Sequence, residues 1–163
     1  ELWSFALDPA APAPRGVSYW PGDATTEARV FVTLGKRLIA LDAASGRIEL
    51  KRAPDGHFYW PGRINGVAVD FLVDTGATST ALPLALAQQA GLVLEGSVRS
   101  STAGGVVDGR LARADVSLQG GVVAERLRVG VLPRLESPLL GMDVISKLRL
   151  TQRDGVLTLE PMR

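Results

Sequence analysis

Asp74 is the residue whose neighbours most favour acid–base chemistry. It follows the apolar run 71–73, which has lost the alternation of apolar and polar residues, and it precedes Thr75 and Gly76. An apolar run of this kind indicates a strand buried on both faces, and glycine lets the backbone turn sharply after it. A carboxylate at the end of such a strand accepts a proton from water when it is ionised and donates one when it is protonated.

Amide hydrolysis through an activated water needs one carboxylate in each of these states. Two carboxylates about 3 Å apart cannot both ionise, so they share a proton and titrate as a unit. The sequence contains Asp-Thr-Gly once, which predicts a two-fold homodimer that places Asp74 against its mate. Asp143 is the alternative second carboxylate, but its place at the start of a predicted helix favours a structural role beside exposed amides.

The composition excludes several other kinds of chemistry. The 163 residues contain no cysteine and one histidine, His57, so thiolate sites, disulfides and histidine-rich zinc motifs cannot form within one chain. A Ser-His-Asp triad would have to use His57. The net charge of +1 creates no field that favours nucleic acid, and we expect no such partner. No run approaches the roughly 20 apolar residues of a membrane-spanning helix.

Three segments differ in composition. Residues 1–27 contain several prolines and predict an extended leader or linker. Residues 28–53 predict three short strands in a β meander that packs onto or extends the main domain. Residues 54–163 form the main domain. The chain starts at Glu1 without an initiator methionine, so we expect a processed or truncated protein and leave an upstream signal peptide or membrane anchor open.

Turn and helix signals divide the main domain. Pro61-Gly62 predicts a turn, while Asn65-Gly66 and Asp154-Gly155 predict hairpin turns because their residues tolerate positive φ. Residues 83–90 predict a short helix, with proline in its first turn and glycine just after it. A second short helix is predicted to open within 139–143 and to run to Lys147.

Two motifs carry a family resemblance. Residues 71–80, Phe-Leu-Val-Asp-Thr-Gly-Ala-Thr-Ser-Thr, resemble the active-site strand and loop of retropepsin-like aspartic proteases, and residues 138–145, Pro-Leu-Leu-Gly-Met-Asp-Val-Ile, resemble the later apolar-apolar-glycine segment of that family. The resemblance covers about 56–160, and the pattern over 141–161 is similar to bacterial membrane-anchored or periplasmic members. It implies an all-β fold, a retropepsin-like closed barrel with two short helices, preceded by the meander.

The resemblance also implies roles for individual residues. Asp74 is the implied catalytic carboxylate, the Thr75 hydroxyl ties the two active-site loops together, and Gly76 allows the sharp turn. Residues 101–109 are implied to form the flap, a hairpin that closes over the substrate, with its tip at Gly104 and Gly105. The residues expected to contact substrate are Ala77, Thr102, Ala103, Gly104, Gly105, Val106 and Leu139.

The function implied is that of an aspartic endopeptidase, which cleaves extended protein or peptide substrates in a homodimer groove. No metal or organic cofactor is implied. The bacterial resemblance leads us to expect the periplasm or cell envelope, with a parent protein that could be membrane-anchored. Two alternatives stay open: a catalytically silent retropepsin-fold binding or dimerisation module, and a periplasmic adaptor that recruits through the meander. We interpret His57, which precedes the aromatic run 58–60, as the ordinary start of a strand.

Overall fold

The computed structural model describes residues 17–24, 28–34, 37–42, 47–102 and 105–161, which fold into thirteen strands and two short helices. The strands are β1 (Val17–Trp20), β2 (Arg29–Leu34), β3 (Arg37–Asp42), β4 (Ile48–Lys51), β5 (Tyr59–Ile64), β6 (Val67–Val73), β7 (Ala81–Pro83), β8 (Glu95–Thr102), β9 (Gly105–Leu118), β10 (Val122–Leu132), β11 (Leu139–Leu140), β12 (Leu148–Arg153) and β13 (Val156–Pro161). The helices are α1 (Leu84–Gln89) and α2 (Met142–Ile145). The all-β prediction is confirmed.

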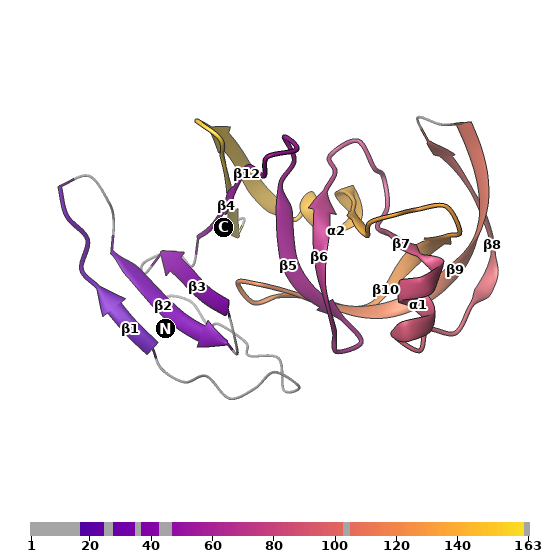
Figure 1. Cartoon of the computed structure of the whole chain (residues 1–163), viewed down its shortest axis with the longest axis horizontal. Helices are drawn as coiled ribbons and strands as arrows, with labels where there is room; N and C mark the ends of the chain where they lie inside the picture. The colour runs from indigo at the N-terminus through magenta and orange to yellow at the C-terminus, as the bar shows by residue number, and fades with distance from the viewer. Residues whose placement is uncertain (1–16, 25–27, 35–36, 43–46, 103–104, 162–163) are drawn as a thin grey trace.

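The main sheet returns on itself. Its strand order is β10-β7-β11-β6-β5-β9-β8, and β9 also pairs with β10, so six of the strands follow one another in a ring while β8 extends outward from β9. Figure 1 shows β5 and β6 side by side at the centre of the chain, with β8, β9 and β10 at one end. The β6 strand, which leads into Asp74, therefore has neighbours on both sides, β5 and β11.

The predicted hairpin turns are present. Asn65 and Gly66 join β5 to β6 with φ values of 45° and 84°, and Asp154 and Gly155 join β12 to β13 with 49° and 76°. Positive φ at both central residues matches the right-handed twist of paired strands, which explains why these dipeptides predict hairpins reliably.

The predicted turn at Pro61-Gly62 is wrong, because both residues lie inside β5. A Cβ at position 62 would lie 2.6 Å from the Ser117 carbonyl oxygen, and the Pro61 carbonyl accepts the Gln119 N–H at 2.8 Å. Glycine is needed here for the close approach of β9 and not for a change of chain direction.

The helices lie near the predicted positions. Pro83 precedes α1, and Gly91 follows it with φ at 66°, as glycine commonly does after a helix. The second helix is shorter than predicted, because Leu139 and Leu140 form strand β11 and α2 begins only at Met142.

The N-terminal strands belong to two different sheets. Part of the predicted leader, β1, pairs with β2, and the sheet order is β1-β2-β3. The β4 strand instead joins the C-terminal hairpin in the order β12-β13-β4. The Arg29 guanidinium on β2 contacts Glu49 on β4 at 2.9 Å, which links the two sheets. Residues 1–16 of the predicted leader lie outside the described residues.

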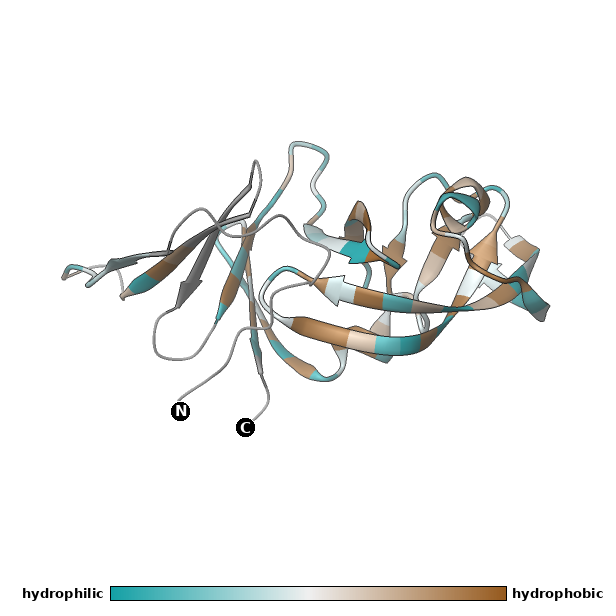
Figure 2. Ribbon diagram, turned by 90° about the horizontal axis from the view of Figure 1, so that it is seen from below, coloured by the Kyte–Doolittle hydropathy of each residue, from teal (hydrophilic) through white to brown (hydrophobic). Residues whose placement is uncertain are grey.

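One hydrophobic core fills the main domain. Its largest fully buried side chains are Trp60, Phe71, Ile64, Leu82, Leu140, Ile145 and Leu159. Ile48 and Leu50 of β4 belong to the same cluster as Leu157 of β13. Hydrophobic and hydrophilic residues recur along the strands in Figure 2, as expected where one face of a strand is buried. This core fixes the ends of β6 and β11, which carry the candidate site.

Candidate active site

Asp74 begins a tight turn directly after β6. The Gly76 N–H donates to Asp74 Oδ1 at 2.8 Å, and the Ala77 N–H donates to the Asp74 carbonyl at 3.2 Å. The Asp74 N–H in turn donates to the Leu140 carbonyl at 3.1 Å. The turn leaves Asp74 half-buried and Gly76 exposed, so one backbone donor, the Gly76 N–H, holds the carboxylate while the residue stays partly open to solvent.

A second segment, far away in sequence, crosses this turn. Leu139 and Leu140 of β11 pair in parallel with Leu72 and Val73 of β6. At the start of α2 the Met142 N–H donates to the Ala77 carbonyl at 2.8 Å. The two motifs identified in the sequence are thus hydrogen-bonded neighbours, and each braces the other.

Gly141 makes this crossing possible. A Cβ at this position would lie 2.5 Å from the Ser79 carbonyl carbon and 2.7 Å from its oxygen. Real Cβ atoms do not approach backbone atoms so closely, hence only glycine fits between β11 and the loop after Asp74.

Asp143 is engaged by Thr80. Its Oδ2 accepts the Thr80 N–H at 2.9 Å, and its Oδ1 accepts the Thr80 hydroxyl at 2.8 Å. The same hydroxyl oxygen accepts the Gly141 N–H at 3.2 Å. Asp143 therefore ties the loop after Asp74 to α2, which agrees with the structural role predicted for it. Its partner is Thr80, however, and not the amides of its own helix.

Sequence reasoning missed Thr80. This residue is fully buried, and its hydroxyl both donates and accepts. A threonine at the end of a loop rich in hydroxyl groups could have indicated a hydrogen-bonding role. The sequence does not show its partner, because Asp143 lies 63 positions away.

The loop that follows Asp74 is mostly exposed. Thr75, Thr78 and Ser79 are exposed, while Ala77 and Leu139 are half-buried. Leu139 lies in β11 beside Leu72. The predicted catalytic residues and Leu139 are therefore brought together at one edge of the domain, and Asp74 is the carboxylate that this edge presents.

The predicted flap is part of a long hairpin. Strands β8 and β9 pair from Glu95–Leu111 to Thr102–Gly105, so the chain reverses between Thr102 and Gly105. Ala103 and Gly104 lie outside the described residues, and so does the side chain of Thr102.

The two faces of this hairpin differ. Val106 is 65% exposed and shares its face with Arg99 and Asp108, which form an ion pair at 3.1 Å. Ser100 and Val107, a directly opposed pair, lie on the other face and are half-buried. The second face is therefore the one directed toward the body of the protein.

The segment before β5 is hydrogen-bonded to the residue that precedes Asp74. The Val73 N–H, next to Asp74, donates to the Phe58 carbonyl at 3.0 Å. At the start of β5 the Tyr59 hydroxyl donates to Asp55 Oδ2, in the segment before the strand, at 2.6 Å. The hydrogen bond from the Tyr59 hydroxyl, and to a smaller extent the one from the His57 N–H, holds the pKa of Asp55 below its usual range. The same bond to the Asp55 carboxylate raises the pKa of Tyr59.

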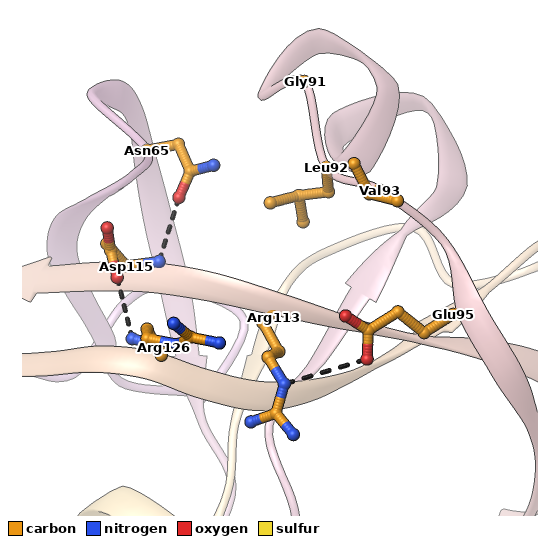
Figure 3. Close-up of a pocket in the computed structure, with 8 residues that line it drawn as sticks. All are labelled: Asn65, Gly91, Leu92, Val93, Glu95, Arg113, Asp115 and Arg126. Carbon is orange, nitrogen blue, oxygen red and sulfur yellow. Dashed lines mark hydrogen bonds and ion pairs between the residues drawn. The ribbon is translucent and has the colours of Figure 1, made fainter.

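A separate pocket of about 310 Å³ lies near the root of the hairpin and is shown in Figure 3. Its lining residues are Asn65, Gly91, Leu92, Val93, Glu95, Arg113, Asp115 and Arg126. Asn65 is in the turn at the start of β6, so the pocket is separated from Asp74 by the length of that strand, roughly 25 Å. It is distinct from the candidate active site.

Comparisons with known proteins agree with this geometry. The aspartyl protease family model matches residues 60–144, just over half of the chain and inclusive of both motifs. An uncharacterised protein of Rickettsia prowazekii (strain Madrid E) is 31% identical over 109 residues, which are 64% of this chain and 46% of that protein. The chain thus spans less than half the length of this curated relative.

A solved structure from a bacterium shows the same fold. The crystal structure of a retropepsin-like aspartic protease from Rickettsia conorii matches with a TM-score of 0.56 and 26% identity, covering 71% of this chain and 90% of that one. The EIAV protease in complex with the inhibitor HBY-793 matches with a TM-score of 0.45 and 21% identity, covering 54% of this chain and 84% of that one.

Proposed function

The chain belongs to the aspartyl protease family and has a retropepsin-like fold, and from this premise we propose that it is an endopeptidase whose active site forms when two copies bring their Asp74 carboxylates together. One observation carries the proposal. The turn from Asp74 to Gly76 is braced by backbone bonds from β11 and α2, yet its outer side is exposed. A half-buried carboxylate in a turn held by backbone hydrogen bonds, beside the exposed Thr75 and Gly76, is suited to meet a second copy.

The chemistry requires both carboxylates. The ionised Asp74 takes a proton from the bound water as its oxygen attacks the peptide carbonyl, while the protonated Asp74 of the other copy donates to the carbonyl oxygen. A tetrahedral diol results. The first Asp74, now protonated, then gives its proton to the amide nitrogen while a diol hydroxyl returns a proton to the other Asp74. The carbon–nitrogen bond breaks to release an amine and a carboxylic acid, and the pair again holds one shared proton. The Gly76 N–H, which donates to Asp74 Oδ1 at 2.8 Å, helps to hold this carboxylate in position.

The proposed substrate is an extended polypeptide that lies between the catalytic turn and the β8–β9 hairpin. Ala77 and Leu139 line the side near Asp74, and the hairpin covers the peptide with Gly105 beside its tip. Because Val107 is on the half-buried face and Val106 on the exposed one, we propose Val107 as the valine that meets substrate. Backbone groups would bind the substrate main chain as an added strand.

We also propose a location in the periplasm or cell envelope, supported by the sequence resemblance to bacterial members. Among the residues that the structure describes, no helix is long and apolar enough to cross a membrane.

Sedimentation equilibrium combined with cleavage of an unstructured protein between about pH 4 and 7 tests the proposal. Asp74→Asn is expected to abolish cleavage, because an amide cannot take the proton from water. Asp154→Asn is the matched control, since Asp154 lies in the distant β12–β13 turn and asparagine tolerates its φ of 49°. A protein that stays monomeric and shows no cleavage, or cleavage indifferent to Asp74→Asn, would instead favour the binding-module reading.

A further inference from the structure

His57 lies two residues before Tyr59, the first residue of β5 that pairs with β6. Tyr59 is opposite Leu72 in the β5–β6 ladder, and the Phe58 carbonyl accepts the Val73 N–H at 3.0 Å. The next pair in the same register would be His57 and Asp74. Paired strands lie about 4.8 Å apart, so this register, continued by two residues beyond Tyr59, would bring the backbone at His57 to about one strand spacing from Asp74, on the side of β6 opposite β11.

The turn that carries His57 is fixed by several contacts. Asp55 Oδ1 accepts the His57 N–H at 3.0 Å, and Asp55 Oδ2 accepts the Tyr59 hydroxyl at 2.6 Å. The Ala53 N–H donates to the His57 carbonyl at 2.8 Å. The Arg52 guanidinium lies over the Phe58 ring, 5.5 Å from its centre. These contacts hold the backbone of His57 in one place relative to Asp74, as specific recognition requires.

The imidazole of His57 takes no part in the hydrogen bonds that fix this turn. His57 is exposed, and the hydrogen bonds of the turn involve its backbone N–H and carbonyl. Within the part of the chain that the structure describes, its ring makes no hydrogen bond. An imidazole carries a positive charge in the acidic range where a carboxylate pair that shares a proton operates.

Resting on the proposed protease function, we infer that His57 is a specificity-determining residue whose imidazolium contacts an acidic side chain of the substrate. Three neighbouring charges bear on this contact. Asp55 is occupied by Tyr59 and the His57 N–H, the Arg52 guanidinium lies over the Phe58 ring, and in the proposed mechanism Asp74 is engaged with water. An extended peptide rises about 3.3 Å per residue. The acidic residue should therefore lie within about three positions of the scissile bond.

Peptide pairs that differ only by Glu or Gln, scanned over about four positions on each side of the scissile bond, test this inference at about pH 5. For the wild-type protein we expect the Glu peptide to have a kcat/KM about three- to fivefold higher at one position, mainly through KM, as for an exposed ion pair. His57→Gln should bring this ratio close to one, and His57→Lys should restore it by returning the charge.

Lys51→Gln is the matched control, because Lys51 is an exposed cation on β4 outside this turn, and it should keep the wild-type ratio. A ratio that survives in His57→Gln, or a His57→Gln change that lowers both peptides equally, overturns the inference while cleavage of the Gln peptides still supports the proposed function. Absence of cleavage of every peptide by the wild-type protein overturns both.

Discussion

The catalytic turn depends on a few residues whose partners lie far away in sequence. Asp74, Thr75 and Gly76 could be identified from the sequence because they are contiguous and follow an apolar run. Thr80 and Gly141 could not be assigned a role, because their contacts join segments about 60 residues apart. Local sequence patterns predict local conformation, whereas such contacts depend on which strands become neighbours.

Gly141→Ala should destabilise the protein and lower cleavage. The added methyl group would overlap the backbone of Ser79, and overpacking of this kind typically costs about 1–3 kcal/mol. Urea denaturation and kcat/KM measure the two effects. Gly130→Ala is the control, because its Cβ would meet only the Ala81 Cβ at 4.0 Å, and we expect a change within about 0.5 kcal/mol. Equal stability of the two variants would contradict the close crossing.

The Asp55–Tyr59 bond should be visible in a titration. The raised pKa of Tyr59 means that its contribution to stability is present below the ordinary value of 10.0 and is lost as the pH rises through the higher folded value. For Asp55 the lowered pKa gives a contribution present above 3.8 and lost as the pH falls through the lower folded value.

An absorbance titration checks this bond. The sequence has two tyrosines, and one of them should ionise above the ordinary range. Asp55→Asn should move that step downward, and Tyr59→Phe should remove it. An unchanged curve for Asp55→Asn would show that the bond does not persist in solution.

At the scale of elements, turns with a strong local signal were predicted correctly, and elements defined by distant partners were not. Asn65-Gly66 sets its own geometry, but Pro61-Gly62 is held in a strand by β9. Residues 48–51 were predicted as a strand of the N-terminal meander. Their pairing with β13 could not be foreseen, because it depends on the C-terminal hairpin.

Strand β4 should be essential for the stability of the protease domain. A chain that begins at Pro54 loses Ile48 and Leu50, whose burial is worth about 1.5–3 kcal/mol each. We expect a loss of several kcal/mol in the free energy of unfolding, and reduced cleavage, relative to a chain that begins at Arg47. Urea denaturation of both chains measures the difference in the free energy of unfolding, and a cleavage assay measures the difference in activity. If the shorter chain is as stable as the longer one, β4 is dispensable for stability. If the shorter chain is more active, the N-terminal segment is inhibitory.

At the scale of the whole molecule, the resemblance of two short motifs was sufficient to predict the fold class. The two motifs are hydrogen-bonded to each other, through the Asp74 N–H and the Ala77 carbonyl, so the presence of both in one sequence indicates this fold. The homodimer stays a proposal that rests on one Asp-Thr-Gly per chain and on an exposed catalytic edge.

Mixed dimers offer a direct test of a shared active site. If each copy supplies one carboxylate, equal amounts of wild-type and Asp74→Asn chains, allowed to exchange, should lower the activity per wild-type chain to about half. An equal amount of Asp154→Asn chains is the control and should cause no loss. Activity independent of added Asp74→Asn chains would mean that each chain acts alone.

The pairing of β4 with β13 also sets an order of events in time. Leu50 is opposite Leu157, and Leu72 is opposite Leu139. The strands β4 and β6 therefore cannot complete their pairing until β13 and β11 have been synthesised. Contacts between such distant residues form slowly because long loops must close first. During synthesis the carboxylate at position 74 leaves the ribosome well before the segment that braces it. A nascent chain should therefore be unable to cleave its neighbours until its last strands have emerged.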